Sequence, residues 1–144
     1  MPTDLIFNRD SAGKILTDKP TLWHCHGSRS LRPLWALEES GIDYDVVNMQ
    51  FPPRINEKNY KSMNVLGTVP YFIDGSQRLS ESTAICHYLV ERYGLDDLRV
   101  QVDHAEYGDY LNWLYMSDAT LTFPQTIVLR YSLFESKDRL LPQA

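Results

Sequence analysis

The first strand-like runs of the sequence alternate with one amphipathic helical pattern, and this alternation limits the folds open to the chain. TLWHC (21–25) and YDVVNM (44–49) have the composition of two short strands. Residues 27–41 predict a helix between them, since apolar residues recur three and four positions apart, Pro33 lies in the first turn and Gly41 follows the end. This order predicts a βαβ unit with parallel strands and a right-handed crossover.

A predicted hairpin follows the βαβ unit. GTVPYFIDGSQRLS (67–80) contains two strand-like runs on either side of Asp74-Gly75, a dipeptide typical of tight hairpin turns. The polar stretch INEKNYKSMN (55–64), which precedes it, predicts a weakly helical segment. The second pair of strands is therefore expected to be antiparallel.

Residues 80–94, SESTAICHYLVERYG, predict a second long helix. Ser80 is the expected N-cap, and Glu81 would lie in the first turn, where an acid suits the helix dipole. Gly94 would end the helix. The predicted order is therefore βαβ followed by ββα, which is a thioredoxin-like α/β layout.

The sequence changes character after this helix. Residues 95–103 include three acids and lose the apolar periodicity, so they predict a linker. Residues 104–144 contain aromatic side chains at helical spacings and predict helices that continue past Pro124 with a kink. Because so small a helical piece rarely builds its own core, we expect the start of an incomplete all-helical domain. Residues 1–19 predict a polar extension, and residues 20–94 the α/β domain.

Composition and charge argue against several classes of protein. The 144 residues are 43% hydrophobic and 23% charged, which is typical of a globular protein with about one domain. A net charge of -5 and the lack of a basic stripe argue against a nucleic-acid partner, and the lack of a long apolar run argues against a membrane. Cys25 and Cys86 form no CxxC pair, so we expect a reducing, cytoplasmic location.

The tripeptide His24-Cys25-His26 consists of residue types that bind zinc, but it does not predict a metal site. Alternation along a strand would send the two histidines to one face and the cysteine to the other. No further cluster of cysteines or histidines completes a set of four ligands. We therefore expect no metal.

The helix over residues 27–41 carries its charges at unfavourable ends. The helix dipole favours anions at the N-terminus and cations at the C-terminus. This helix has Arg29 and Arg32 near its start and Glu38 and Glu39 near its end. A positive corner at a helix N-terminus would stabilise a nearby anion.

Three stretches in order, GSRSLRPLWALEESGIDYDVV, NVLGTVPYFIDG and LSESTAICHYLVERYG, resemble the glutathione S-transferase family. The resemblance covers residues 21–94, which are similar to the thioredoxin-like N-terminal domain of that family. YLNWLYMSDATLTFP looks like the first long helix of the family's all-helical C-terminal domain. Members of the family are longer, so this chain resembles one that stops early in the helical domain.

The resemblance implies that a hydroxyl near the positive corner stabilises the thiolate of glutathione. In serine-type members the catalytic serine lies four residues before an arginine that corresponds to Arg32, and that position is Ser28. Ser30 is the rival, since it lies in the same turn and could be the N-cap. The first strand offers no tyrosine, and Cys25 lies too early for the cysteine-type site.

The resemblance also implies a binding site for the whole tripeptide. The backbone of Thr68 and Val69 would pair with its cysteinyl unit through a cis bond to Pro70. Glu81 and Ser82 would bind its γ-glutamyl ammonium and carboxylate. The glycine carboxylate requires a cation, for which we name Arg54, although Lys58 and Lys61 lie in the same stretch.

The expected activity is conjugation of glutathione, as co-substrate, to a small hydrophobic electrophile, which is a detoxification reaction. If the long helix is regular, Tyr115, Ala119 and Thr122 share the face that would contact the electrophile. The aromatic residues on these helices predict an interface, and the resemblance implies a two-fold dimer, so we expect a homodimer. Two alternatives remain: a non-enzymatic module that binds glutathione or dimerises, and a glutaredoxin-like oxidoreductase.

Overall fold

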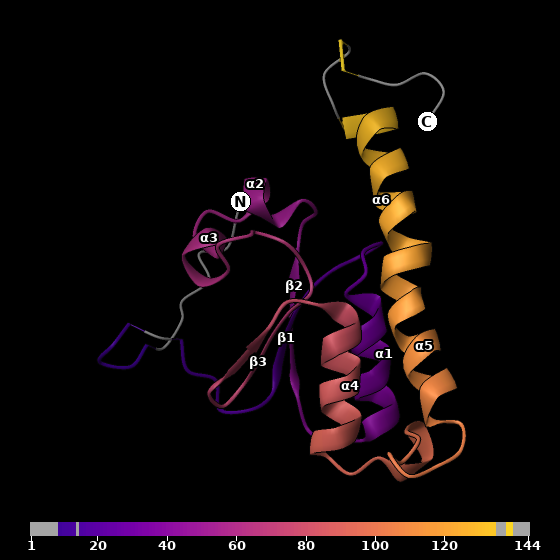
Figure 1. The fold of residues 1–144 in the computed structure, drawn as a ribbon. Coiled ribbons are helices and arrows are strands. Elements are labelled where there is room, and N and C mark those ends of the chain that lie inside the picture. The colour runs from indigo at the N-terminus through magenta and orange to yellow at the C-terminus, as the bar shows by residue number, and fades with distance from the viewer. Residues whose placement is uncertain (1–8, 14, 135–137, 140–144) are drawn as a thin grey trace. The chain divides into compact units, whose positions relative to one another are not determined.

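Four strands form one mixed sheet in the order β2-β1-β3-β4 (Figure 1). The computed structural model describes residues 9–13, 15–134 and 138–139. The strands are β1 (Thr21–Cys25), β2 (Asp45–Met49), β3 (Tyr71–Asp74) and β4 (Gln77–Leu79). β1 pairs in parallel with β2 and antiparallel with β3, and β3 forms the antiparallel hairpin with β4. The predicted parallel pair and the predicted hairpin are both confirmed.

The helices complete the predicted layout. In chain order they are α1 (Leu31–Ser40), α2 (Pro53–Asn56), α3 (Tyr60–Met63) and α4 (Ser82–Arg92), followed by the short 3-10 helix η1 (Asp96–Leu98). The order βαβ–ββα, with two short helices between β2 and β3, confirms a thioredoxin-like α/β fold. By its contacts the chain divides into two compact units, residues 1–99 and residues 100–144.

β1 lies inside the sheet and is buried along its whole length, so both faces of the sheet are covered at this strand. One face packs on α1 and α4, which lie side by side (Figure 1). That layer contains the buried residues Leu22, Leu37, Phe72, Ile85 and Leu89. The other face packs on α3 and the chain before β3, through Ile15, Trp23, Cys25, Met49, Tyr60, Val69, Tyr71 and Ile73. Alternating side chains of β1 supply both layers.

The topology brings several backbone segments to one end of the sheet. α1 returns from the end of β1, so its N-terminus lies near Cys25. β3 is antiparallel to β1, and its first residue, Tyr71, pairs with Trp23. α4 follows β4 and again begins at the end where β1 finishes. Both helix N-termini and the Val69–Pro70 segment therefore meet beyond the last residue of β1.

The start of α4 differs from the prediction. The helix begins at Ser82 with Glu81 in the N-cap position, so the expectation that Ser80 caps it is wrong. β4 ends at Leu79, and the extended backbone of Glu81 (φ -93°, ψ 124°) leads the chain from the sheet edge into the helix. Gly94 has φ 65° just after the helix, which agrees with its predicted role as a stop.

Among the described residues of the predicted polar extension, Ile15 belongs to the core. Ile15 is 4% exposed and belongs to the layer that contains Trp23. It forms an isolated antiparallel bridge with Arg9, and its carbonyl accepts a hydrogen bond from the guanidinium of Arg78. A pair of adjacent apolar residues, Ile15 and Leu16, is too short to give a periodic signal, although Ile15 buries apolar surface where the fold covers it.

The second unit is a run of consecutive helical segments. They are α5 (Tyr107–Met116), the π-helix η2 (Ser117–Thr122), α6 (Phe123–Leu129) and the π-helix η3 (Arg130–Phe134). Helix does continue past Pro124, as predicted. The condition of a regular helix before Pro124, on which the predicted electrophile face depends, is not met. The chain widens there into a π-helical segment, where the Thr122 hydroxyl donates to the carbonyl of Ser117 at 2.6 Å. Proline lacks the N–H that a regular turn needs, which accounts for an irregularity at this place.

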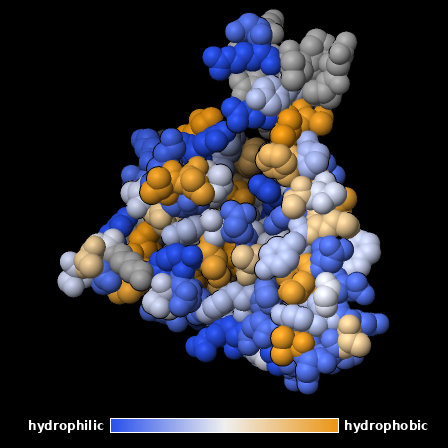
Figure 2. Space-filling view, viewed as in Figure 1, coloured by the Kyte–Doolittle hydropathy of each residue, from blue (hydrophilic) through white to orange (hydrophobic). Residues whose placement is uncertain are grey.

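Large hydrophobic side chains remain exposed on this helical unit. The residues concerned are Trp113, Tyr115, Leu121, Phe123, Ile127, Val128 and Leu129, each at least 40% exposed. Figure 2 shows hydrophobic residues reaching the surface among polar ones. None of the helices in the described ranges is both long and apolar enough to cross a membrane.

Candidate functional site

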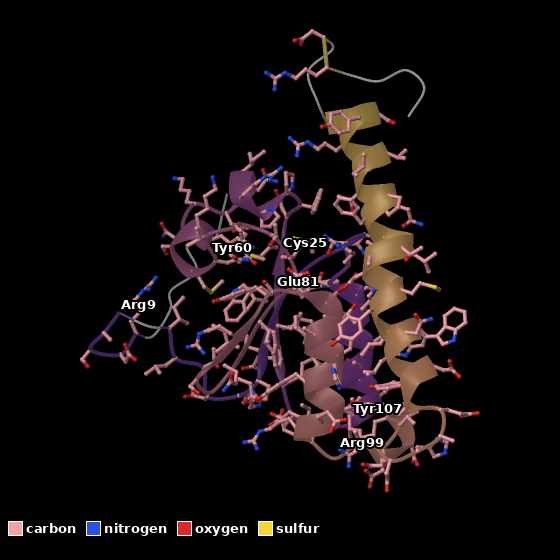
Figure 3. The ribbon with its side chains drawn as sticks, in the orientation of Figure 1. Arg9, Cys25, Tyr60, Glu81, Arg99 and Tyr107 are labelled. Carbon is pink, nitrogen blue, oxygen red and sulfur yellow. The ribbon has the colours of Figure 1, made fainter. Side chains whose placement is uncertain are left out.

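The end of the sheet described above gathers most of the residues that the sequence singled out. Figure 3 labels Cys25, the last residue of β1, and Glu81, the residue before α4, at this end of the sheet. Ser28 lies in the turn between β1 and α1 and is partly buried. Val69 and Pro70 precede β3 and are buried. Residues distant in sequence thus surround one corner.

Two serines and a histidine form a hydrogen-bonded chain at this corner. The Ser28 hydroxyl donates to the carbonyl of Cys25 at 2.8 Å, and its oxygen lies 2.6 Å from the hydroxyl of Ser30. The Ser30 hydroxyl lies 2.7 Å from Nδ1 of His24. It also accepts a hydrogen bond from the N–H of Cys25 at 3.2 Å. The chain runs from a partly exposed hydroxyl to a buried imidazole.

Ser30 occupies the N-cap position of α1 but does not cap the helix. Its side chain forms no capping hydrogen bond, and its backbone is already helical (φ -65°, ψ -9°). The side chain instead turns inward to the end of β1 and is 0% exposed. Ser28, by contrast, is only partly buried. Of the two candidate hydroxyls, only Ser28 has surface that a bound molecule could contact.

The histidines of the HCH tripeptide have separate surroundings. His24 is 8% exposed in β1, and burial lowers the pKa of its imidazole. His26 follows the strand and is exposed, so the expectation that both histidines share one strand face is wrong, because β1 ends at Cys25. The described ranges contain no group of three metal-binding side chains.

Cys25 is a poor nucleophile in this fold. Its side chain is 0% exposed, and burial raises the pKa of the thiol to about 11, with the charge of Glu57 as a smaller cause. The thiol is therefore protonated at neutral pH, whereas thiol exchange requires a thiolate.

Arg32 links the two helix N-termini across the corner. Its guanidinium donates to the hydroxyl of Ser82 at 3.2 Å, so α1 and α4 are tied at their first turns. At the other end of α1 the carboxylate of Glu38 accepts a hydrogen bond from Tyr44, and that of Glu39 accepts one from Trp35. The two glutamates that oppose the dipole of α1 thus have hydrogen-bond partners, and Arg32 lies at the candidate site.

The segment before β3 has a fixed backbone. The Val69–Pro70 peptide bond is cis, as the family resemblance implied. The carbonyl of Thr68 accepts two hydrogen bonds, from the hydroxyl of Tyr60 at 2.6 Å and from the amide of Asn64 at 2.8 Å. The side-chain oxygen of Asn64 also accepts from the N–H of Leu66 at 3.1 Å.

Tyr60 and Asn64 were not among the predicted site residues. Tyr60 is fully buried and Asn64 is 5% exposed. Asn64 could have been singled out from the sequence as a polar residue in the short connection that precedes the Val69-Pro70 pair. Both act through the backbone of Thr68, and therefore shape the segment that would pair with a bound peptide.

Replacing Asn64 with Ala should lower the free energy of unfolding. The change removes one hydrogen bond to Thr68 and leaves the N–H of Leu66 without its side-chain partner, at a cost of about 1–3 kcal/mol in unfolding free energy. Chemical denaturation would measure the loss. Asn59→Ala is the matched control, because Asn59 is exposed and its side chain makes no capping bond. Equal effects of the two changes would contradict the assigned role of Asn64.

The three candidate cations for the glycine carboxylate are exposed. Gly67 has φ +60°, and a Cβ built on it would lie 2.6 Å from Cβ of Arg54 and 3.5 Å from Cγ of Lys61. Arg54 and Lys61 therefore lie beside the segment that contains Thr68. Because both cations lie beside this segment, the geometry does not separate Arg54 from Lys61, and the choice of Arg54 stays a prediction.

The three residues predicted to contact the electrophile lie on the helical unit. Tyr115 is 60% exposed, Ala119 is exposed and Thr122 is 7% exposed. The prediction assumed a regular helix, but Ala119 and Thr122 lie in the π-helical segment η2. Their shared face is therefore not the one that α-helical spacing implies.

Comparison with known proteins gives a consistent result. Glutathione S-transferase 3 of Schizosaccharomyces pombe is 33% identical over 105 residues, which are 69% of this chain and 41% of that protein. Glutathione S-transferase F10 of Arabidopsis thaliana is 28% identical over 108 residues, which are 72% of this chain and 49% of that protein. The chain thus spans about half the length of these relatives or less.

A solved structure has the same fold. The theta class glutathione S-transferase of Xanthomonas axonopodis pv. citri, with glutathione bound, superposes with a TM-score of 0.66 at 25% identity. The match covers 85% of this chain and 59% of that one. The family model "Glutathione S-transferase, N-terminal domain" matches residues 19–91, which are 73 of the 144 residues. With this match over half of its length, the chain belongs to the glutathione S-transferase family.

Proposed function

We propose that this chain binds glutathione and takes part in its conjugation to a hydrophobic electrophile. The observation that carries the proposal is the meeting of Ser28, the cis Val69–Pro70 segment and the start of α4 at one end of the sheet. These parts offer a hydroxyl for the sulfur, backbone for the peptide and a helix N-terminus for a carboxylate.

The start of α4 suits the γ-glutamyl end of glutathione. Ser82 is 3% exposed, and its oxygen accepts a hydrogen bond from Arg32. A hydroxyl that accepts a bond keeps its own proton to donate, and a cation beside it favours a negatively charged acceptor. Exposed Glu81 would pair with the ammonium group beside that carboxylate. Arg54 would meet the glycine carboxylate at the other end of the peptide.

Ser28 would stabilise the thiolate by donating its proton to the sulfur. The donation replaces its bond to the carbonyl of Cys25 and lowers the pKa of the bound thiol. With a chlorinated aromatic electrophile, the thiolate sulfur attacks the carbon that carries chlorine. A C–S bond forms, the C–Cl bond breaks, and chloride leaves with the electron pair. Positioning and the lowered thiol pKa supply the catalysis.

The surroundings of Cys25 disfavour the glutaredoxin-like alternative, because a buried thiol with a pKa of about 11 does not attack a disulfide. The non-enzymatic alternative predicts the same glutathione binding as the transferase proposal but no conversion of the electrophile. If the chain retains glutathione but releases no chloride from a chlorinated aromatic, the module is a binding domain. If it releases chloride in proportion to consumed thiol, the transferase proposal holds.

Glu81→Gln and Ser82→Ala should each weaken glutathione binding about tenfold, since each removes one interaction with a charged group. Titration calorimetry with the full chain measures the affinity, and retention on immobilised glutathione gives a second readout. Glu106→Gln is the matched control, because this exposed glutamate precedes α5 in the other unit. Undiminished binding by both variants would remove the start of α4 from the site.

The remaining parts of the proposal concern the whole protein. The electrophile would contact the face that contains Tyr115, and the exposed aromatic residues of α5 and α6 support a homodimer. A cytoplasmic location and a role in detoxification are part of the same proposal, and the family membership supports them.

A further inference from the structure

The buried end of the serine chain is not used by the proposed chemistry. Ser28 would contact the sulfur, but Ser30 and His24 lie behind it, 0% and 8% exposed. A buried imidazole in an apolar layer costs free energy unless its nitrogens are paired, and here Nδ1 is paired with a hydroxyl. The hydrogen-bonded contacts from Ser28 to Ser30 and from Ser30 to His24 thus add two buried residues to the candidate site.

The proton count at Ser30 couples His24 to Ser28. A serine hydroxyl has one proton and two acceptor lone pairs. The N–H of Cys25 can only donate, so it occupies one lone pair of Ser30. One lone pair and one proton then remain for Nδ1 of His24 and the hydroxyl of Ser28. The Ser30 hydroxyl also lies 3.4 Å from the carbonyl of Cys25, a longer contact than those to Nδ1 of His24 and to Ser28. When its proton takes one of the two shorter contacts, Ser30 accepts from one of these neighbours and donates to the other.

The two arrangements have opposite effects on Ser28. If Nδ1 of His24 is bare, Ser30 donates to it and draws the Ser28 proton inward. If Nδ1 carries a proton, it donates to Ser30, and Ser30 donates to Ser28. Ser28 also accepts from the N–H of Ser30 at 3.2 Å, so both of its lone pairs are then filled. Its proton then points away from Ser30, to the carbonyl of Cys25 or to a bound sulfur.

We propose that neutral His24, protonated at Nδ1, is a positioning residue that directs the Ser28 proton to the sulfur of bound glutathione through Ser30. The inference rests on the proposed function. The donors run from Nδ1–H to Ser30, from Ser30 to Ser28, and from Ser28 to the thiolate. No proton is consumed, and the thiol proton leaves to solvent. Consecutive donors polarise one another, so the last bond is stronger than that of an isolated hydroxyl.

The lowered pKa of His24 agrees with this assignment: burial is the main cause of the shift, a hydrogen bond to the backbone of Ser30 opposes it, and the nearby His26 adds to it. The ring is therefore neutral at pH 7 and has one N–H, which the chain requires at Nδ1. The backbone of Cys25 holds the donors in place, because its N–H donates to Ser30 and its carbonyl lies 2.8 Å from the hydroxyl of Ser28 and 3.4 Å from that of Ser30.

His24→Leu and His24→Asn form the decisive pair of variants. Leu offers no donor, whereas the amide of Asn can donate from a position close to that of Nδ1. The pKa of the bound thiol is read from the ultraviolet absorbance of the thiolate as pH is raised, and glutathione affinity is read by calorimetry. We expect Leu to raise the thiol pKa by about one, a tenfold change in its ionisation constant, with affinity changed less than about threefold. Asn should restore most of the wild-type value.

Ser30→Ala breaks the same chain at its middle and should raise the thiol pKa in the same way, even where the leucine variant does not fold. Ser40→Ala is the matched control, because Ser40 also forms hydrogen bonds on α1 but at the opposite end. A merely structural His24 would lower stability and leave the thiol pKa unchanged, which would overturn the inference. If the wild-type chain forms no thiolate at neutral pH, the proposed function fails with it.

Discussion

Replacing Ser28 with Ala should lower the rate of conjugation about a hundredfold and leave glutathione affinity nearly unchanged. The hydroxyl is the partly exposed end of the serine chain, so its proton is the one placed to meet a bound sulfur. Removing a single donor to a catalytic anion typically costs a factor of about 10²–10³ in rate. In the proposed site the carboxylates of the tripeptide would bind elsewhere, so the affinity should lose little. Steady-state kinetics with a chlorinated aromatic and calorimetry with glutathione measure the two quantities.

The structure changes the control for this experiment. Sequence alone offers Ser30→Ala as a neutral comparison, but Ser30 binds both Ser28 and His24, so its removal disturbs the same chain. Ser40→Ala is the suitable control, since it removes a hydroxyl from the far end of α1. Wild-type rates in the Ser28 variant would show that another group stabilises the thiolate.

Phe72→Ala should lower the free energy of unfolding by about 3–5 kcal/mol. Phe72 is 0% exposed in the centre of β3, between Leu22 of β1 and Ile85 of α4 in one core layer. Its ring also meets that of Tyr88 edge to face, with centroids 6.2 Å apart. The smaller side chain leaves a cavity between the sheet and its helices. Since domains of this size are stable by about 5–15 kcal/mol, the loss is a large part of the total.

Phe51→Ala is the matched comparison for that loss, because the same aromatic ring is removed from a side chain that is 51% exposed. We expect it to cost well under half as much. Urea unfolding followed by circular dichroism would measure both variants. A similar cost for the two would mean that the layer between the sheet, α1 and α4 is not the main core of residues 1–99.

Local patterns in the sequence predicted most of the secondary structure of the first unit. The strand over residues 21–25, the Asp74-Gly75 turn and the stop at Gly41 were predicted correctly, because apolar periodicity and turn preferences act over a few residues. The same capping preferences placed the start of α4 wrongly, with Ser80 in place of Glu81 at the N-cap. Two serines flank Glu81, and only the end of β4 at the sheet edge decides which residue begins the helix.

The contacts that build the candidate site depend on the tertiary structure. Arg32 and Ser82 are fifty residues apart in sequence, and they meet only because α1 and α4 both run opposite to β1. The contact between Ser30 and His24 exists because the Ser30 hydroxyl points away from the helix that it could have capped. A hydrogen bond depends on distances of about 3 Å and on angle. Residue type and spacing can propose its partners, but the packing of helices on the sheet decides which of them meet.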